Sequence, residues 1–391
     1  MDTRFYRLPN YNYALYQTNS INYISHNYNS SADLQVLTKY ISMHFKVNEN
    51  SIKLMDSGSS AILYIINMMK DIMAIDSVYI PSYFCLEVAD AILTSKCKIK
   101  LYELNYNLMP TKAFIESLQK EQQSLLIFPS FFGKNYIDEE MLYLLSQLNI
   151  PIIFDEAQSF PMESTIFGYY LKYWFSIVSF GRSKPCSSVG GGAVISHNCS
   201  DEINIYLLKE LKFIENDYNL EKKISISFDT LEALINSRTI KEKYIVPISK
   251  IQAYSAYYRC LSFLEYKKSL STLDAWYLLS IKDIKCIPNK NKPISEYSYF
   301  PIFVNSQERY NIMKIFGDLG IQCTFYYYPI HLNKKYCTSS HSSFSFSEKI
   351  FSSILILPLH QDLNTNKIYC MLSIIFDILK ESEFHAEFLE C

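Results

Sequence analysis

Short apolar runs alternate with stretches of helical spacing between residues 52 and 196. Seven runs have the length and apolar character of buried strands: 52–55, 78–80, 99–102, 125–128, 152–155, 175–179 and 193–196. Between them, apolar positions recur at helical spacing over residues 59–73, 85–95, 111–121 and 138–147. This alternation predicts an α/β fold with a seven-stranded, mostly parallel sheet and helices on both faces.

The alternation is less regular in the rest of the chain. Helical spacing recurs over residues 32–46, 201–224, 228–237, 249–279 and 364–380, and further strands are expected at 297–304, 323–327 and 354–358. We therefore predict a large domain over residues 31–245 and a smaller C-terminal α+β domain over residues 246–391. Residues 1–30 are rich in Tyr, Asn and Ser without a helical period. They are interpreted either as an N-terminal arm that packs on a neighbouring subunit or as a poorly ordered lead-in.

Composition narrows the function classes. Of the 391 residues, 49% are hydrophobic and 19% are charged, which predicts a folded chain with more than one core. The net charge of −2, without blocks of like charge, argues against a nucleic-acid partner or an anionic membrane. The N-terminus lacks the apolar segment of a signal peptide, and no apolar run reaches the ~18–20 residues of a membrane span. Ten cysteines without a CxxC pair suit reduced thiols, so a cytoplasmic location is expected.

Metal ligands and arginines are scarce. His331, Cys337 and His341 fit no common zinc spacing, so no metal site is predicted. Any bidentate clamp on a carboxylate or phosphate must come from six arginines: Arg4, Arg7, Arg182, Arg238, Arg259 and Arg309.

Polar residues follow several predicted strands. Because parallel sheets bind ligands beyond the carboxyl ends of their strands, Asp155 and Ser179 are placed to meet a ligand. The turn 57–61 (Ser-Gly-Ser-Ser-Ala) precedes a predicted helix, where backbone N–H groups and serine hydroxyls can bind an anion. Taken alone, the turn is better explained as an ordinary helix cap, and it matches neither a Walker loop nor GxGxxG.

Lys184 lies on a short loop after the strand that ends at Ser179. A lysine amine can form a Schiff base with pyridoxal phosphate (PLP), and a strand-end Asp155 can pair with the pyridine nitrogen of that cofactor. Gln158 can hydrogen-bond a ring oxygen, and Gly190 to Gly192 can let the backbone run close to a flat ligand. Taken singly, each of these residues also has an ordinary explanation: Lys184 as a surface lysine, Asp155 as a helix cap, and Gly190 to Gly192 as a plain glycine turn.

The order of these motifs resembles fold type I PLP-dependent enzymes, and among them the DegT/DnrJ/EryC1/StrS aminotransferase family. The similarity extends over about residues 30–380. In the first half of the chain, 57–61 matches the family's phosphate turn, 80–84 its Pro-Ser-aromatic segment, and 155–158 its Asp-x-Ala-Gln block. Residues 179–184 match its Ser-Phe-x-x-x-Lys motif, and 191–192 its paired glycines. Further on, 248–253 matches its helix signature, 327–331 its Tyr-x-Pro-x-His pattern, and 357–360 its Leu-Pro-Leu-His pattern.

The resemblance implies a role for each matched residue. Lys184 would be the Schiff-base lysine that moves protons, Asp155 the partner of the pyridine nitrogen, and Gln158 the contact of the ring hydroxyl. The phosphate would be held at the turn by Gly58, Ser59 and Ser60, together with Ser179. Family members work as dimers with the active site at the subunit interface, so a homodimer is expected.

Several family positions differ here. The residues 245–247 (Ile-Val-Pro) stand where relatives often carry Asn-Tyr-Arg, Gly190 stands at a glutamate, and Thr324 at an arginine. Cys85 stands at the ring-stacking aromatic, so Phe84 is expected to stack instead, with Tyr83 as the other candidate. Arg182 and Arg238 are candidate substrate contacts.

Three functions remain open from the sequence. The first is a PLP-dependent aminotransferase that uses an amino acid donor such as glutamate and a keto acceptor, for which a nucleotide-linked keto-sugar is a candidate. The second is a PLP enzyme of another type, catalysing dehydration, decarboxylation or carbon–carbon bond formation. The third is a non-catalytic relative, which the presence of both Asp155 and Lys184 disfavours.

Overall fold

The structure is a computed structural model. It describes residues 32–380 apart from residues 134–136, 163–170, 182–183, 189, 198–199, 210–244, 246, 249, 283, 285–286, 288–290, 337–343 and 362. The predicted N-terminal arm, the helix expected at 228–237 and most of the segment before the domain boundary at residue 245 lie outside the described residues. The two-domain division therefore stays a prediction.

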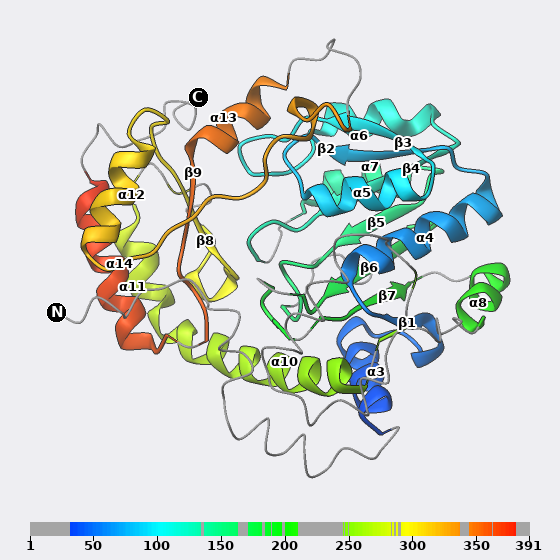
Figure 1. Cartoon of the computed structure of the whole chain (residues 1–391), viewed down its shortest axis with the longest axis horizontal. Helices are drawn as coiled ribbons and strands as arrows, with labels where there is room; N and C mark the ends of the chain where they lie inside the picture. The colour runs from blue at the N-terminus through cyan, green and yellow to red at the C-terminus, as the bar shows by residue number, and fades with distance from the viewer. Residues whose placement is uncertain are drawn as a thin grey trace.

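A seven-stranded sheet forms the centre of the chain, in the order β1-β7-β6-β5-β4-β2-β3 (Figure 1). The strands are β1 (Ile52–Met55), β2 (Ser77–Pro81), β3 (Lys98–Tyr102), β4 (Ser124–Pro129), β5 (Ile152–Asp155), β6 (Trp174–Ser179) and β7 (Gly192–Ser196). All neighbouring pairs are parallel except those of β7, which runs antiparallel to both β1 and β6. The predicted mostly parallel α/β sheet is confirmed.

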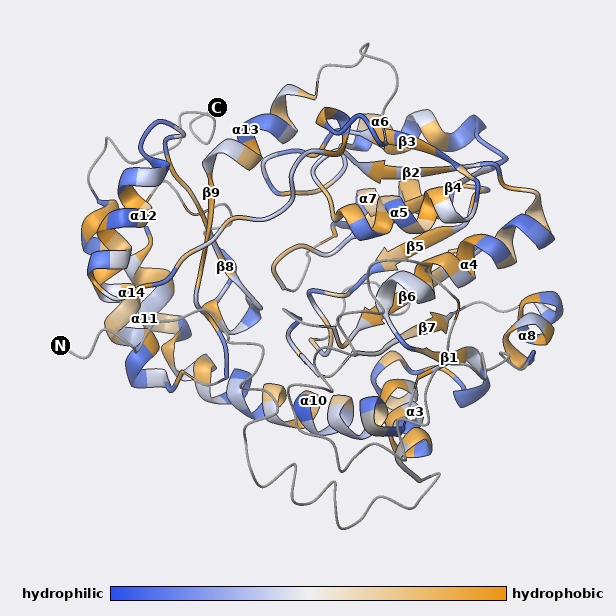
Figure 2. Ribbon diagram, in the orientation of Figure 1, coloured by the Kyte–Doolittle hydropathy of each residue, from blue (hydrophilic) through white to orange (hydrophobic). Residues whose placement is uncertain are grey.

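Apolar residues cover both faces of this sheet. In β6 and β7, Ile177 and Val194 belong to one buried cluster, whereas their neighbours Val178 and Ala193 belong to another. The first cluster contains residues of α4 (Gly58–Met73), α5 (Leu86–Thr94), α6 (Lys112–Ser117) and α7 (Glu139–Ser146). The second contains residues of α3 (Ala32–Phe45) and α10 (Lys250–Leu270), which lie side by side. Figure 2 shows β4 and β5 as hydrophobic ribbons, as two buried faces require.

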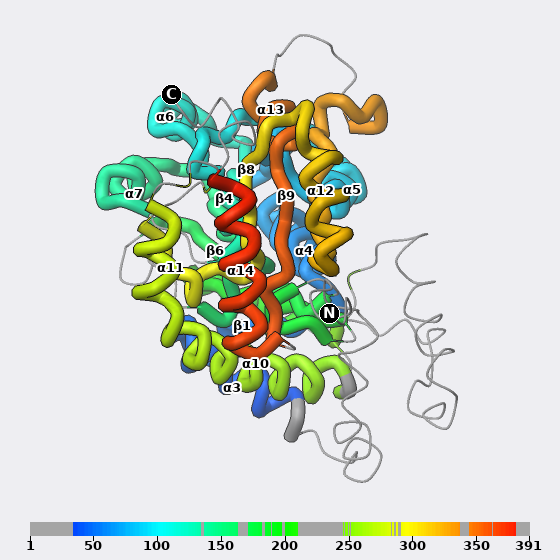
Figure 3. Tube along the Cα trace, turned by 90° about the vertical axis from the view of Figure 1, so that its left-hand side faces the viewer, coloured from blue at the N-terminus to red at the C-terminus, as the bar shows by residue number. Residues whose placement is uncertain are grey.

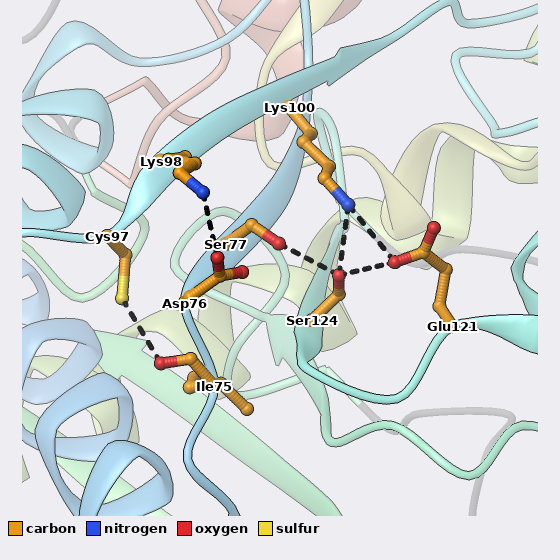
Figure 4. A network of polar contacts seen from close by, with 8 residues as sticks. All are labelled: Ile75, Asp76, Ser77, Cys97, Lys98, Lys100, Glu121 and Ser124. Carbon is orange, nitrogen blue, oxygen red and sulfur yellow. Dashed lines mark hydrogen bonds and ion pairs between the residues drawn. The ribbon is translucent and has the colours of Figure 1, made fainter.

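The amino ends of three strands are joined by a polar network (Figure 4). The Ser77 and Ser124 hydroxyls lie 2.9 Å apart, and Ser124 donates to Glu121 at 2.7 Å. Lys100 on β3 reaches the same Glu121 carboxylate at 3.0 Å. These bonds satisfy polar groups between β2, β3 and β4 at the edge of the sheet opposite Asp155.

The C-terminal part is built around a small antiparallel sheet of β8 (Phe300–Phe303) and β9 (Ile354–Leu357). Around it lie α11 (Asp274–Ser280), α12 (Arg309–Asp318), α13 (Ser345–Ser353) and α14 (Thr365–Leu379) (Figures 1 and 3). The helix predicted over 249–279 is interrupted by a 3₁₀ turn at Ser271–Leu273. The helix predicted over 201–224 is present as α8 (Asp201–Leu208), which ends before the non-helical Lys209, and residues 210–224 lie outside the described residues.

The strand predicted at 323–327 is wrong. Only Thr324 pairs with β9, through a single bridge to Ile356. Tyr327 then adopts a positive φ of 60°, which ends any extended run, so the following residues leave the sheet. Within the described residues, no helix is long and apolar enough to cross a membrane.

Candidate active site

A pocket opens at the carboxyl ends of β4, β5 and β6, where Pro129, Asp155 and Ser179 end their strands. Together with its opening to solvent it encloses about 480 Å³. The arrowheads of β2 and β5 point from the sheet toward β8 and β9, so this edge faces the C-terminal elements (Figure 1). Seven of the predicted site residues line the pocket: Gly58, Ser59, Phe84, Asp155, Gln158, Ser179 and Lys184.

The anion-binding turn is shaped by the first residues of α4. Ser57 is the N-cap, and its hydroxyl accepts a hydrogen bond from the Ser60 N–H at 3.1 Å. The buried Ser60 hydroxyl lies 2.9 Å from that of Ser57, and Ser60 does not line the pocket. Gly58 and Ser59 line the pocket from the first turn of α4, where the leading N–H groups of a helix have no partner inside the helix itself.

Gly58 allows α4 to begin directly against the end of β6. A Cβ at this position would lie 2.9 Å from Ser179 Cβ and 3.1 Å from Ser179 Oγ. This close approach brings the Ser179 hydroxyl to the first turn of α4. We call the place where Gly58, Ser59 and Ser179 meet the α4 corner of the pocket.

The glycine run has a different role from the expected one. Gly190 to Gly192 do not line the pocket. A Cβ on Gly192 would lie 2.6 Å from the Ser57 carbonyl carbon, and the Gly191 N–H donates to the Asp56 carbonyl at 2.7 Å. These residues let the backbone of β7 approach the anion-binding turn rather than a ligand.

Asp155 and Lys184 are the two charged groups on the sheet side of the pocket. Asp155 is buried, and its carboxylate accepts the Ala157 N–H at 3.0 Å. Burial raises the pKa of Asp155, whereas the positive charge of Lys184 and the Ala157 N–H act in the opposite direction. No α-helix follows Asp155, because residues 157–161 form turns, so the helix-cap alternative is excluded for this carboxylate.

The Lys184 loop is held by α10. Arg259 donates to the Ser187 carbonyl at 3.2 Å, and the Ser188 hydroxyl lies 3.5 Å from the Gln252 carbonyl. The Ser188 N–H also bonds the Phe180 carbonyl at 2.9 Å. These contacts fix the backbone just after Lys184, so the amine projects from an anchored loop.

Gln158 is held by the protein on both sides of its amide. Its Oε1 accepts the Phe132 N–H at 3.0 Å, and its Nε2 donates to the Tyr327 hydroxyl. Its backbone carbonyl accepts from Ser298. The contact of Gln158 with a ring hydroxyl stays a prediction, and the Tyr327 hydroxyl is now a second group placed to make it.

Tyr327 was missed as a pocket residue, although the sequence places it before Pro329 and His331. Its ring lies edge-on to Tyr83 at 5.6 Å, and burial raises its pKa. The segment is tied to the end of β2, because Ile330 N–H donates to the Ser82 carbonyl at 2.8 Å. His331, considered above as a metal ligand, instead bonds Ser82 and Glu348, and Cys337 and His341 lie outside the described residues.

Aromatic rings form another wall. Phe84 is 3% exposed and lies edge-on to Phe131 at 5.9 Å. Phe131 lines the pocket from the loop after β4 and was also missed. Cys85 lines the pocket as well, and burial raises the pKa of its thiol.

A second buried carboxyl group lies directly after Asp155. Glu156 is 1% exposed, accepts from the Ser176 hydroxyl at 2.7 Å, and has its pKa raised by burial to about 7. Ser176 also lies 2.9 Å from His197, whose ring stacks on Trp174 and whose pKa is lowered by burial to about 3. The sequence analysis identified none of Glu156, Ser176 and His197 as site residues.

The predicted arginine contacts are not placed. Arg182 and Arg238 lie outside the described residues. Arg309 is buried against Phe325, with its guanidinium 4.2 Å from that ring, and Arg259 holds the Ser187 carbonyl. No arginine of the described chain lines the pocket.

Comparison with known proteins supports the same relationship. The model of the DegT/DnrJ/EryC1/StrS aminotransferase family matches residues 42–375. A dTDP-4-amino-4,6-dideoxy-D-glucose transaminase of Shigella dysenteriae is 25% identical over 279 residues, covering 67% of this chain and 68% of the relative.

Solved structures share the fold. NtdA of Bacillus subtilis with bound cofactor PMP has a TM-score of 0.68 at 18% identity, covering 96% of this chain and 83% of that one. The GDP-4-keto-6-deoxy-D-mannose-3-dehydratase of E. coli with bound hydrated PLP has a TM-score of 0.68 at 13% identity, covering 91% and 95%. The chain belongs to the PLP-dependent DegT/DnrJ/EryC1/StrS aminotransferase family and has the fold type I architecture.

Proposed function

We propose that this family member is an aminotransferase that moves an amino group from an amino acid donor, with glutamate as first candidate, to a keto acceptor. The observation that carries the proposal is the meeting of Lys184, Asp155 and the α4 corner in one pocket. A nucleotide-linked keto-sugar is the proposed acceptor, since the Shigella relative is a nucleotide-sugar transaminase by name.

The residues fit the family's cofactor. Gly58 leaves a cradle that a Cβ would fill, and the Gly58 and Ser59 amides with the Ser59 and Ser179 hydroxyls suit a phosphate. The buried Asp155 carboxylate suits a protonated ring nitrogen, and the Phe84 side chain suits a ring face. When bound, pyridoxal phosphate supplies an electron sink for the reaction at the substrate Cα.

The chain's own groups then act as follows. Lys184 would hold the cofactor through its Nζ and, once the substrate amine has replaced it, would take up and return the proton at the substrate Cα. Asp155 keeps the ring nitrogen charged, and the Ala157 N–H holds the carboxylate in place at 3.0 Å. The Gln158–Tyr327 pair orients the ring hydroxyl, and the wall of Phe84 and Phe131 excludes water.

The subunit arrangement and the acceptor contacts are part of the same proposal. We infer a homodimer in which the partner completes the substrate side of the pocket, with Arg182 and Arg238 as candidate anion contacts. The absence of arginine from the described pocket lining supports this, because an anionic acceptor needs a cation from elsewhere.

Glutamate-dependent release of 2-oxoglutarate by the full-length chain tests the proposal. Lys184→Ala should abolish it, whereas Lys172→Ala, which removes an exposed lysine bonded to Asn149, should leave it unchanged. Turnover that survives Lys184→Ala contradicts the proposed role.

A second candidate is a PLP enzyme of another reaction type, such as dehydration. The change of basic family positions at 245–247 and Thr324 favours it, and the dehydratase of E. coli shares the fold. No conversion with any common amino donor, together with cofactor-dependent loss of water from a substrate, would select this candidate.

A further inference from the structure

Glu87 places a carboxylate in the phosphate corner of the pocket. It lies in the first turn of α5, lines the pocket, and its Oε2 accepts the Ser59 hydroxyl at 3.2 Å. Ser59 is also a residue that should hold the cofactor phosphate. A carboxylate therefore occupies the position in which the start of α4 would receive an anion.

The Ser59 hydroxyl can serve only one acceptor at a time, because it carries a single hydrogen. A phosphate that takes this hydrogen must displace Glu87. Glu87 is exposed, and its backbone in α5 keeps it near the corner.

The charges of the pocket make this competition unfavourable for the phosphate. Its described lining contains one cation, Lys184, and two carboxylates, Asp155 and Glu87. Lys184 already lowers the pKa of Asp155, so its charge is shared with that group. A phosphate monoester carries close to two negative charges at neutral pH, and Glu87 adds repulsion.

We propose that Glu87 lowers the affinity of this chain for the cofactor by competing with its phosphate for Ser59 and for the start of α4. The inference rests on the proposed function, because it assigns the phosphate to that corner. Two unit charges about 4 Å apart in water attract or repel by roughly a fivefold factor in affinity. A dianion doubles this free energy, whereas solvent screening of an exposed side chain reduces it, so we expect a penalty of about three- to tenfold.

Equilibrium dialysis of the full-length chain against PLP and against pyridoxal, which lacks the phosphate, tests the proposal. Glu87→Gln keeps the size of the side chain and removes its charge. It should tighten PLP binding about three- to tenfold in low salt and leave pyridoxal binding unchanged. The difference should shrink in about 0.5 M salt, where exposed charges are screened.

Two further variants make the result specific. Glu116→Gln removes an exposed carboxylate from α6 outside the pocket lining and should change neither affinity. Glu87→Ala should tighten PLP binding in the same direction as Glu87→Gln. Agreement of both Glu87 variants would show that the lost charge, not a new amide contact, causes the gain.

Each contrary result has its own meaning. Equal PLP affinity of the wild type and Glu87→Gln overturns the competition while leaving the proposed function intact. Equal tightening of PLP and pyridoxal also overturns it, because Glu87 would then act on the ring. Failure of both proteins to bind PLP overturns the proposed function together with this inference.

Discussion

Replacing Glu156 by Gln should stabilise the chain, and the gain should grow as the pH rises. Glu156 is buried beside Asp155 and accepts the Ser176 hydroxyl at 2.7 Å. A glutamine has nearly the same shape and can still accept this bond, but it cannot ionise. The substitution therefore isolates the cost of a buried carboxylate charge.

The size of the effect follows from the pKa of Glu156, which burial raises from the ordinary value of 4.5 to about 7. At about 1.36 kcal/mol per pKa unit, this corresponds to a penalty of roughly 3 kcal/mol when the group is fully ionised. The Ser176 hydrogen bond lowers the pKa and the Asp155 charge raises it, so both are already contained in this value.

The sign is set by which state holds the proton more tightly. Below pH 4.5 both the folded and the unfolded chain carry a protonated Glu156, so the penalty is absent. Between pH 4.5 and about 7 the unfolded chain releases the proton while the folded chain keeps it, so stability falls with rising pH. Above about pH 7 the penalty is complete and constant.

Urea unfolding of both proteins between about pH 5 and 8 measures this difference directly. The unfolding free energy of Glu156→Gln relative to wild type should rise by about 2–3 kcal/mol across that range. Glu121→Gln is the matched control, since the bonds from Ser124 and Lys100 lower the pKa of Glu121 and its loss should not stabilise the chain. A difference that stays flat, or that falls with rising pH, would refute the reasoning.

Two other substitutions test the geometry of the pocket. Gly58→Ala should destabilise the chain by about 1–3 kcal/mol, because its Cβ would lie 2.9 Å from Ser179 Cβ, and adding Ser179→Gly should recover most of that loss in a urea double-mutant cycle. A coupling free energy near zero between the two substitutions would contradict the close approach of Gly58 and Ser179. Tyr327→Phe should cost about 1–2 kcal/mol in the same assay and shift the absorbance of bound cofactor, because Gln158 Nε2 loses its acceptor. An unchanged spectrum would place Tyr327 away from the ring.

The parallel core of the fold could be predicted because its strands are buried on both faces. Such strands appear in sequence as continuous apolar runs, and the predicted bounds of β1 and β5 match the structure. The antiparallel direction of β7 is not a property of its apolar residues, since a buried strand has the same composition in either direction. It depends on the connection from β6 through the Lys184 loop.

The C-terminal part was harder to predict. The helices α12 (Arg309–Asp318) and α13 (Ser345–Ser353) were not predicted: α12 has only a few apolar positions, and α13 is short and rich in serine, which favours helix interiors less than alanine or leucine does. Conversely, residues 323–327 carry aromatic side chains typical of a strand, but Tyr327 has a positive φ and lines the pocket instead of continuing a strand. Tertiary contacts decide such segments.

Some residues of the candidate site could likewise be predicted from the sequence, and others could not. Asp155, Ser179 and Lys184 could be predicted because each follows a recognisable strand, and strand ends of a parallel sheet converge. Phe131 and Tyr327 could not, because they come from loops whose paths depend on bonds such as the one from Ile330 to Ser82. Glu87 has the ordinary sequence signature of an acidic residue in a first helical turn, and only its contact with Ser59 distinguishes it.

Borohydride reduction of the cofactor-loaded, full-length chain, followed by peptide mass spectrometry, tests the central claim most directly. Reduction makes the bond between the cofactor and a lysine permanent, so the modified residue can be identified without any substrate. Lys184 should be the modified residue, and the modification should be lost in Lys184→Ala. Modification of a different lysine, or of none while the cofactor remains bound, would contradict the assignment of this pocket.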